Sequence, residues 1–237
     1  MGKWSNLLHR IELARGPRLF LSLEKDLSRI GFCDPRVIFD VGAHLGQTTL
    51  HLRKVFQNAH IHSFEPVAEN FQRLIRNIGQ RDRLSPNKIA LGSSIGTAFI
   101  DEGFSDLTHS ISNSVEATKI QAKEEVLIET IDGYMANEQI DKIDLLKIDT
   151  EGHEIEVLKG AEVAIENNRI EAILAECDFS RQDKQHTYFP DLLEYLGHQG
   201  FAFFGLYDVI HYSNSHGIGY CNALFLNRET FSSPPSL

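Results

Sequence analysis

The feature that most constrains this chain is the segment 37–50, VIFDVGAHLGQTTL. An apolar run with β-branched residues carries Asp40 near its end, a turn with Gly42 and Gly46 follows, and a helical pattern begins after the turn. A strand, a glycine turn and a helix in this order are typical of the first unit of a doubly wound α/β fold that holds a nucleotide cofactor. The segment therefore predicts both where the sheet begins and where a ligand binds.

Downstream of residue 36, apolar strands alternate with amphipathic helices. We expect strands at 37–41, 60–64, 87–91, 97–100, 126–129, 143–148, 172–176, 201–207 and 222–226, and helices at 47–56, 68–78, 131–135, 154–167 and 189–196. Such alternation predicts a mostly parallel sheet covered on both faces, with ligands at the carboxyl ends of its strands. The 237 residues fit one such domain at 36–237 behind a helical extension at 1–35.

The extension carries apolar residues at helical spacing on both sides of a Gly16-Pro17 break. We expect two amphipathic helices that cover one edge of the core. Contact with a membrane surface or a partner, a homodimer included, is the alternative, because basic residues flank Trp4. The segment lacks the apolar core of a secretory signal, and the sequence has no run of 18 apolar residues. We therefore expect a cytoplasmic protein without a transmembrane segment.

Charge and cysteine content exclude further classes. A formal net charge of −10 argues against a nucleic-acid partner, which requires a basic surface. Cys33, Cys177 and Cys221 are too widely spaced for a disulfide framework or a CxxC metal pair. We expect all three to be buried apolar residues in a reducing compartment.

The turn after the first strand has the pattern Gly-x-x-x-Gly between Gly42 and Gly46. A dinucleotide turn has Gly-x-Gly-x-x-Gly, in which the second glycine lets the backbone approach a pyrophosphate. His44 occupies that position here and would crowd a pyrophosphate. S-adenosylmethionine (SAM) has no pyrophosphate, and Asp40 could hold its methionine ammonium or fix the loop amides. A plain tight turn is the alternative.

Glu65 follows the second strand, and Pro66 ends that strand. An acid near this place can accept both hydroxyls of a ribose. NAD and SAM both contain a ribose, so Glu65 predicts a nucleoside cofactor while His44 favours SAM. A solvated strand end is the alternative.

A third polar segment, KIDTEGHE at 147–154, follows the strand at 143–148. Asp149, Glu151 and His153 alternate, so an extended or tightly turned backbone would bring them to one side. A carboxylate and an imidazole there could take a proton from a hydroxyl as a methyl group arrives. Helix capping is one alternative, and a Mg²⁺ site built from the same atoms is another.

These segments together resemble the FkbM-type family of SAM-dependent methyltransferases, within the class I methyltransferase fold. The resemblance covers about residues 36–228 and is carried by 39–48, 64–66, 90–92 with Gly96, and 144–161. The order Lys-Ile-Asp-x-Glu-Gly-His-Glu in the last segment is its most specific part. His44 departs from the family, which more often has a smaller polar residue such as Asn there.

The resemblance implies a doubly wound, Rossmann-like sheet of seven strands whose last strand is antiparallel. It implies that SAM is lined by Asp40, Gly42, Ala43, His44, Gly46, Glu65 and Asp149, with Ala90 and Leu91 near the adenine. Asp149, Glu151 and His153 would face the transferring methyl group. The implied reaction is O-methylation of a hydroxyl on a sugar, glycolipid or polyketide-like product.

For such a reaction we expect His153 to be the base, oriented by Asp149 or Glu151. Glu176, at the tip of a later strand, is the second candidate.

The polar segment 106–114 suits a hydroxylated, carbohydrate-containing acceptor, with candidate contacts at His109, Ser110 and Asn113. Two rival functions stay open. An NAD(P)-dependent oxidoreductase would need a glycine in place of His44, and a domain that binds SAM without turnover would not need acids at three strand tips.

Overall fold

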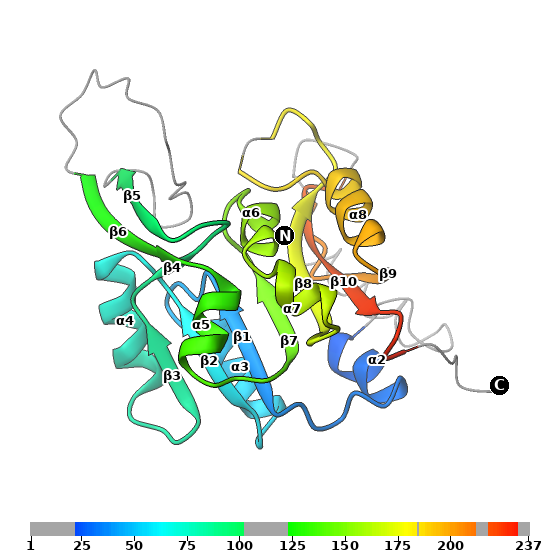
Figure 1. Cartoon of the computed structure of the whole chain (residues 1–237), viewed down its shortest axis with the longest axis horizontal. Coiled ribbons are helices and arrows are strands. Elements are labelled where there is room, and N and C mark those ends of the chain that lie inside the picture. The colour runs from blue at the N-terminus through cyan, green and yellow to red at the C-terminus, as the bar shows by residue number, and fades with distance from the viewer. Residues whose placement is uncertain (1–21, 102–122, 184, 212–217, 232–237) are drawn as a thin grey trace, which may run out of the picture.

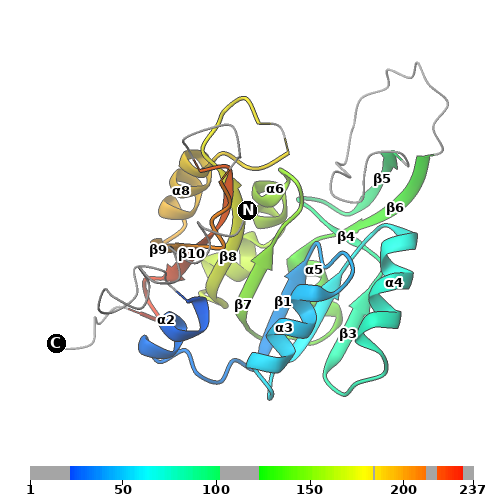
Figure 2. The same ribbon diagram turned by 180° about the vertical axis from the view of Figure 1, so that it is seen from behind.

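The computed structural model describes residues 22–101, 123–183, 185–211 and 218–231. Its main sheet has seven strands, with helices on both faces (Figure 1 and Figure 2). The strands are β1 (Val37–Val41), β2 (His60–Phe64), β3 (Leu84–Asn87), β7 (Ile143–Ile148), β8 (Ile170–Asp178), β9 (Phe201–Tyr207) and β10 (Tyr220–Asn227).

The strands lie in the order β3-β2-β1-β7-β8-β10-β9. The pairs from β3 to β8 are parallel, and β10 runs antiparallel to both of its neighbours. The mostly parallel, doubly wound sheet with an antiparallel last strand is thus confirmed. Because β1 and β7 are central, the loops that follow them meet at one edge of the sheet.

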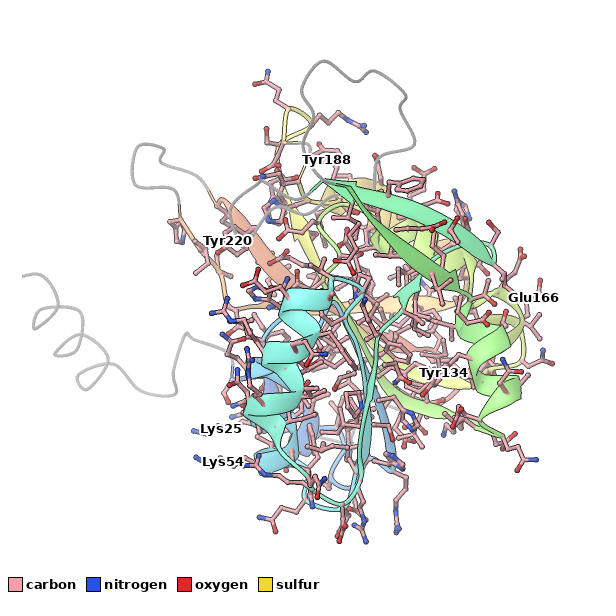
Figure 3. All side chains as sticks on the ribbon, turned by 90° about the vertical axis from the view of Figure 1, so that its left-hand side faces the viewer. Lys25, Lys54, Tyr134, Glu166, Tyr188 and Tyr220 are labelled. Carbon is pink, nitrogen blue, oxygen red and sulfur yellow. The ribbon has the colours of Figure 1, made fainter. Side chains whose placement is uncertain are left out.

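One helical layer consists of α2 (Leu23–Arg29), α3 (Gln47–Val55) and α4 (Ala68–Ile78). The other consists of α5 (Ile131–Asn137), α6 (Glu154–Lys159), α7 (Glu162–Glu166) and α8 (Phe189–His198). Figure 3 shows the layers on opposite sides of the sheet, with Lys25 and Lys54 on one flank and Tyr134 and Glu166 on the other. Separate apolar clusters fill the two faces, because successive strand residues point to opposite sides.

A second, three-stranded sheet has the order β4-β6-β5. It contains β4 (Ala90–Leu91), β5 (Gly96–Asp101) and β6 (Lys123–Glu129). The single strand expected at 87–91 is therefore wrong, since the chain leaves the main sheet after β3 and enters the small sheet at β4. Pro86 is tolerated in β3 because β3 is an edge strand.

The single helix expected at 154–167 is also wrong, because it divides into α6 and α7 around Gly160. A Cβ at Gly160 would lie 2.0 Å from the carbonyl oxygen of Gly92, which follows β4. The break therefore lets the helix pack directly against the backbone of the small sheet.

Of the expected N-terminal helices, the structure describes α2, which packs through Leu27 against the main sheet. The remainder of the segment, including Trp4, lies outside the described residues. Within the described part of the chain, no helix is long and apolar enough to span a bilayer.

Candidate functional site

The loops after β1 and β7 are locked together by backbone contacts. The Asp149 amide donates to the Val41 carbonyl oxygen at 3.1 Å, and a Cβ at Gly42 would lie 1.8 Å from the Asp149 carbonyl oxygen. Gly42 also has a φ of +75°, which favours glycine. Glycine is therefore required here twice, for its conformation and for the close approach of the two loops.

The tip of β2 joins the same assembly through Glu65. Its Oε2 accepts a hydrogen bond from the His44 amide at 3.0 Å, and its Oε1 accepts one from the Val67 amide at 2.9 Å. Glu65 is only 5% exposed, and this burial raises the pKa of its carboxyl to about 7. The residue expected to bind a ribose thus also holds the first loop in place.

These loops surround a cavity that opens to solvent. Eight of the residues expected to bind cofactor or to act in catalysis line it: Gly42, His44, Glu65, Ala90, Leu91, Asp149, Glu151 and His153. Apolar side chains from the β3–β4 region form one wall, and the polar residues after β7 form another.

Asp40, Ala43 and Gly46, which we also expected to contact the cofactor, are not among the residues that line the cavity. Asp40 is fully buried, accepts a hydrogen bond from the Thr49 hydroxyl at 2.6 Å and lies 3.4 Å from Lys147 Nζ. Ala43 packs against α4, and a Cβ at Gly46 would lie 2.7 Å from Leu74 Cδ1. These three residues shape the loop from beneath rather than line the cavity.

Asp149, Glu151 and His153 follow β7. All three line the first cavity, so they lie on one side as the sequence predicts. Glu151 has a φ of +52°, an uncommon conformation for a residue with a side chain, and His44 across the cavity has one of +47°. Burial, with the nearby carboxylates of Asp149 and Glu154, raises the pKa of Glu151 to about 7. Such backbone conformations are concentrated at functional sites, which supports a functional role for this cavity.

Lys147 is a site residue that the sequence-based reasoning missed. Its ammonium lies 3.2 Å from Asp149 Oδ2 and 3.4 Å from Asp40 Oδ1, and the residue is 4% exposed. Burial alone would lower its pKa, but the two carboxylates outweigh burial and hold the pKa above its usual value. The signal was available, since a lone lysine in an apolar central strand requires a charged partner.

Glu176, the second candidate for the base, lies near the end of β8, next to the residue that pairs with Ile148 just before Asp149. Burial and the Asp149 charge raise the pKa of Glu176 well above its usual range. Burial raises the pKa of Asp149, but Lys147 and Glu176 together outweigh burial and lower it. The pair therefore carries one proton and one negative charge near neutral pH.

His186, in the loop between β8 and α8, also contacts this pair. Its Nε2 lies 3.5 Å from Glu176 Oε2 and its Nδ1 lies 3.2 Å from Asp183 Oδ2. The ring stacks on Tyr220 with centroids 4.9 Å apart. His186 stands in an irregular loop, so no local sequence pattern indicates this placement.

A second cavity, of about 1,140 Å³ with its open mouth, lies on the α2–α3 side of the sheet. Its wall includes Gln47, Thr48, Tyr207 and Asn222, together with Lys147 and Asp149. Asp149 lines both cavities, so this carboxylate stands where the two approach each other.

Several expectations for the site can be compared with the described residues. His109, Ser110 and Asn113 lie outside them. Among the residues that are described, no group of three or more His, Cys, Asp or Glu side chains could hold a metal ion, so the Mg²⁺ alternative gains no support. Cys177 and Cys221 are buried as expected, whereas the expectation for Cys33 is wrong because it is exposed at the surface.

The fold is similar to that of known methyltransferases. Magnesium protoporphyrin IX methyltransferase from Synechocystis PCC 6803, solved with bound SAM, is 11% identical and has a TM-score of 0.50, with 95% of this chain and 92% of that chain covered. An rRNA methylase from Streptococcus thermophilus also has a TM-score of 0.50 at 11% identity, covering 89% of this chain and 99% of that one. At this identity the likeness shows the class I, Rossmann-like fold.

Two curated relatives are similar in sequence. Methyltransferase sdnD from Sordaria araneosa is 31% identical over 155 residues, which cover 53% of this chain and 60% of that protein. Hexuronic acid methyltransferase AglP from Haloferax volcanii is 29% identical over 136 residues, which cover 55% of this chain and 52% of that protein. The matched part of the chain thus spans somewhat more than half the length of each relative.

The family model described as the methyltransferase FkbM domain matches residues 40–203, which include all three strand tips of the first cavity. This chain belongs to the FkbM methyltransferase family.

Proposed function

We propose that the protein is a SAM-dependent O-methyltransferase that acts on a hydroxyl group of a carbohydrate-containing small molecule. The observation that carries this proposal is the first cavity, whose walls present Glu65, an apolar surface and the acids after β7 in turn. S-adenosylmethionine has a part to match each of these walls, namely a ribose, an adenine and a charged methionine.

The cavity residues fit SAM at each part of the molecule. The Glu65 carboxylate suits the two ribose hydroxyls, and Ile89, Ala90 and Leu91 offer an apolar surface to the adenine. Gly42 lets the loop after β1 close on the backbone of Asp149, and His44 lines the cavity at the position where the dinucleotide pattern has a glycine. Together with family membership, this favours SAM over the NAD(P) of the rival oxidoreductase.

Bound SAM would supply a methyl group on a sulfonium, whose sulfur is a good leaving group. The protein must hold the acceptor oxygen in line with that methyl group and remove the proton of the hydroxyl. Asp149, Glu151 and His153 are the candidates for these roles because they line the polar end of the cavity. Asp149 also reaches the second cavity, which is large enough for a sugar ring and is walled by amide, hydroxyl and carboxylate groups.

The name of the relative AglP supports a sugar acceptor, because it describes a methyltransferase for a hexuronic acid. The second cavity supports hydroxyl groups as the contacts, since Thr48, Tyr207 and Asn222 can each donate or accept hydrogen bonds.

Thermal unfolding with excess SAM, S-adenosylhomocysteine (SAH) or NADH tests the cofactor. A ligand at 100 times its dissociation constant stabilises a protein by about 2.7 kcal/mol, which is a shift of several degrees for a domain of this size. We expect shifts with SAM and SAH that Glu65→Ala abolishes and that Glu69→Ala, an exposed acid on α4, leaves unchanged. Stabilisation by NADH alone would contradict the proposal.

Transfer of labelled methyl from SAM to methyl α-D-glucopyranoside and to methyl β-D-glucuronoside tests the acceptor class. We expect an O-methylated product from at least one glycoside. SAM binding without transfer to any hydroxylated acceptor in a wider panel would favour a domain that binds SAM without turnover.

A further inference from the structure

A line of side chains leads from the Asp149 carboxylate to the surface loop after β8. Asp149 and Glu176 come directly after the paired residues Ile148 and Ala175 of β7 and β8, Glu176 lies 3.5 Å from Nε2 of His186, and Nδ1 of His186 lies 3.2 Å from Asp183. Side-chain exposure along the line is 12% for Glu176, 10% for His186 and 15% for Asp183. The line thus connects a site wall with a loop through groups that each exchange protons.

We propose that His186 acts through Glu176 as a proton relay, carrying the proton of the methyl acceptor from the Asp149–Glu176 pair toward Asp183. This inference rests on the proposed O-methyl transfer. It makes His186 a positioning residue, because the imidazole contacts the pair and not the reacting atoms.

The proton count is balanced at every step. The acceptor loses its hydroxyl proton as its oxygen forms a bond to the methyl carbon, and the sulfur of SAM keeps the electron pair of the broken carbon–sulfur bond. Asp149 takes the proton, Glu176 passes its own proton to Nε2 of His186, and Nδ1 releases one to Asp183. The proton on Asp149 then moves to Glu176, Asp183 releases its proton to water, and the imidazole exchanges its ring protons with water to recover its first tautomer. Every group thereby regains its starting charge without an oxidant or a metal.

The surroundings of His186 suit this role better than a purely structural one. Stacking on Tyr220, with an interplanar angle of 9°, fixes the plane of the imidazole. That plane directs the two ring nitrogens to two different carboxyl groups, so that one nitrogen can accept while the other donates. His153 lines the first cavity, whereas Glu176, His186 and Asp183 are not among the residues that line it.

Other charged and titratable groups also act on the pair and on His186. They are Lys147 on β7, Glu151 after β7, Asp178 on β8, Asp183 in the following loop and Tyr220 on β10. Lys147 favours the ionised form of the pair and Glu151 opposes it. A test must therefore change His186 while leaving these groups in place.

The first test compares His186→Gln with His198→Gln, which changes an exposed histidine at the end of α8. With labelled SAM and the two glycosides above, we expect His186→Gln to lower kcat about tenfold to a hundredfold, at the lower end of what acid–base groups contribute. The KM for SAM should stay unchanged, the acidic limb of the kcat–pH profile should move, and added imidazole should restore part of the rate. His198→Gln should change none of these.

A uniform loss of kcat at every pH without imidazole rescue would overturn the relay, as would an unchanged kcat. Either result would leave O-methyl transfer itself intact, because the unmodified protein would still methylate the glycoside.

A second measurement needs no acceptor. The infrared carbonyl band of a protonated carboxyl group, identified by its loss in Glu176→Gln, can be titrated in the SAH-bound protein. We expect His186→Gln to move this titration to lower pH, because Nε2 of the imidazole accepts the Glu176 proton in the relay and so stabilises the protonated carboxyl. Coincident titrations in the two proteins would overturn the inference even if neither glycoside is methylated, whereas absence of SAM and SAH binding would count against the proposed function instead.

Discussion

Glu65 shows how one side chain can set the pH dependence of ligand binding. Its carboxyl has a pKa raised by burial to about 7, and the diol of a ribose binds best to the ionised form. Binding should therefore release a proton, and affinity for SAM should rise about tenfold between about pH 6 and about pH 8. Isothermal titration calorimetry in buffers of different ionisation enthalpy measures both the affinity and the proton release.

The raised pKa of Glu65 also makes the free energy of unfolding depend on pH. A pKa raised on folding means that Glu65 favours the folded state fully below its unfolded pKa of 4.5, and this contribution is lost as pH rises through about 7. Glu65→Gln should weaken SAM binding and flatten its pH dependence. SAM binding by Glu151→Gln is the matched comparison, because this variant removes another cavity carboxyl whose pKa is also raised to about 7. An unchanged pH dependence in Glu65→Gln would show that another group controls binding.

Gly42 and Gly31 form a natural pair for separating backbone strain from steric exclusion. Both have positive φ, of +75° and +85°, but a Cβ at Gly42 would meet the Asp149 carbonyl oxygen, whereas at Gly31 no heavy atom of the described residues lies within 4 Å. Gly31→Ala should cost about 1 kcal/mol for its left-handed conformation, and Gly42→Ala should cost at least about 2 kcal/mol more. Urea unfolding of both variants measures the difference, and equal losses would mean that the two loops separate easily.

At the scale of elements, β1 and β7 are joined by a buried ion pair as well as by their backbone ladder. Lys147 on β7 lies between Asp40 on β1 and Asp149. Lys147→Met should cost about 3–5 kcal/mol, because it leaves buried carboxylates without their cation. Lys142→Met, which removes a half-exposed ion pair with Glu171 at the other end of β7, should cost less than about 1 kcal/mol.

Chemical denaturation of the two lysine variants distinguishes these cases. A double variant, Lys147→Met with Asp40→Asn, should regain part of the loss because it removes one unpaired charge. If Lys147→Met is no more destabilising than Lys142→Met, water reaches the carboxylates and the ion pair does not hold the strands together.

The elements show where sequence reasoning succeeds and where it stops. β1, β2, α4, β7 and β9 have the expected bounds, because each is a regular apolar pattern that ends at a glycine, a proline or a polar turn. The error at 87–91 lies where the chain passes from the main sheet to the small one, and the error at 154–167 lies where a helix meets the backbone that follows β4. A local pattern identifies an extended or helical segment, but it does not contain the distant partner, such as the Gly92 carbonyl that meets Gly160.

The site residues also divide into those that a local sequence pattern identifies and those whose place depends on distant contacts. Glu65, Asp149, Glu151 and His153 could be chosen from the sequence because the carboxyl ends of parallel strands meet at one edge. Asp40 is also an acid near the end of a parallel strand. Its strand position faces the α3 side, however, so it contacts Thr49 and Lys147 beneath the loop. His186 could not be chosen, since its place beside Glu176 depends on the path of an irregular loop.

At the scale of the whole molecule, the central position of β1 determines at which stage of folding the site can form. β1 pairs on one side with β2, which follows it closely in the sequence, and on the other with β7, about a hundred residues later. Long-range pairing of this kind slows folding, because a large loop must close before the contact is gained. During synthesis, a nascent chain that stops short of β7 has Gly42 and Glu65 but lacks the backbone of Asp149 against which the glycine loop rests. The ligand cavity is therefore a late product of folding, and SAM can act as a folding ligand for this protein only after the ribosome has released the second half of the sheet.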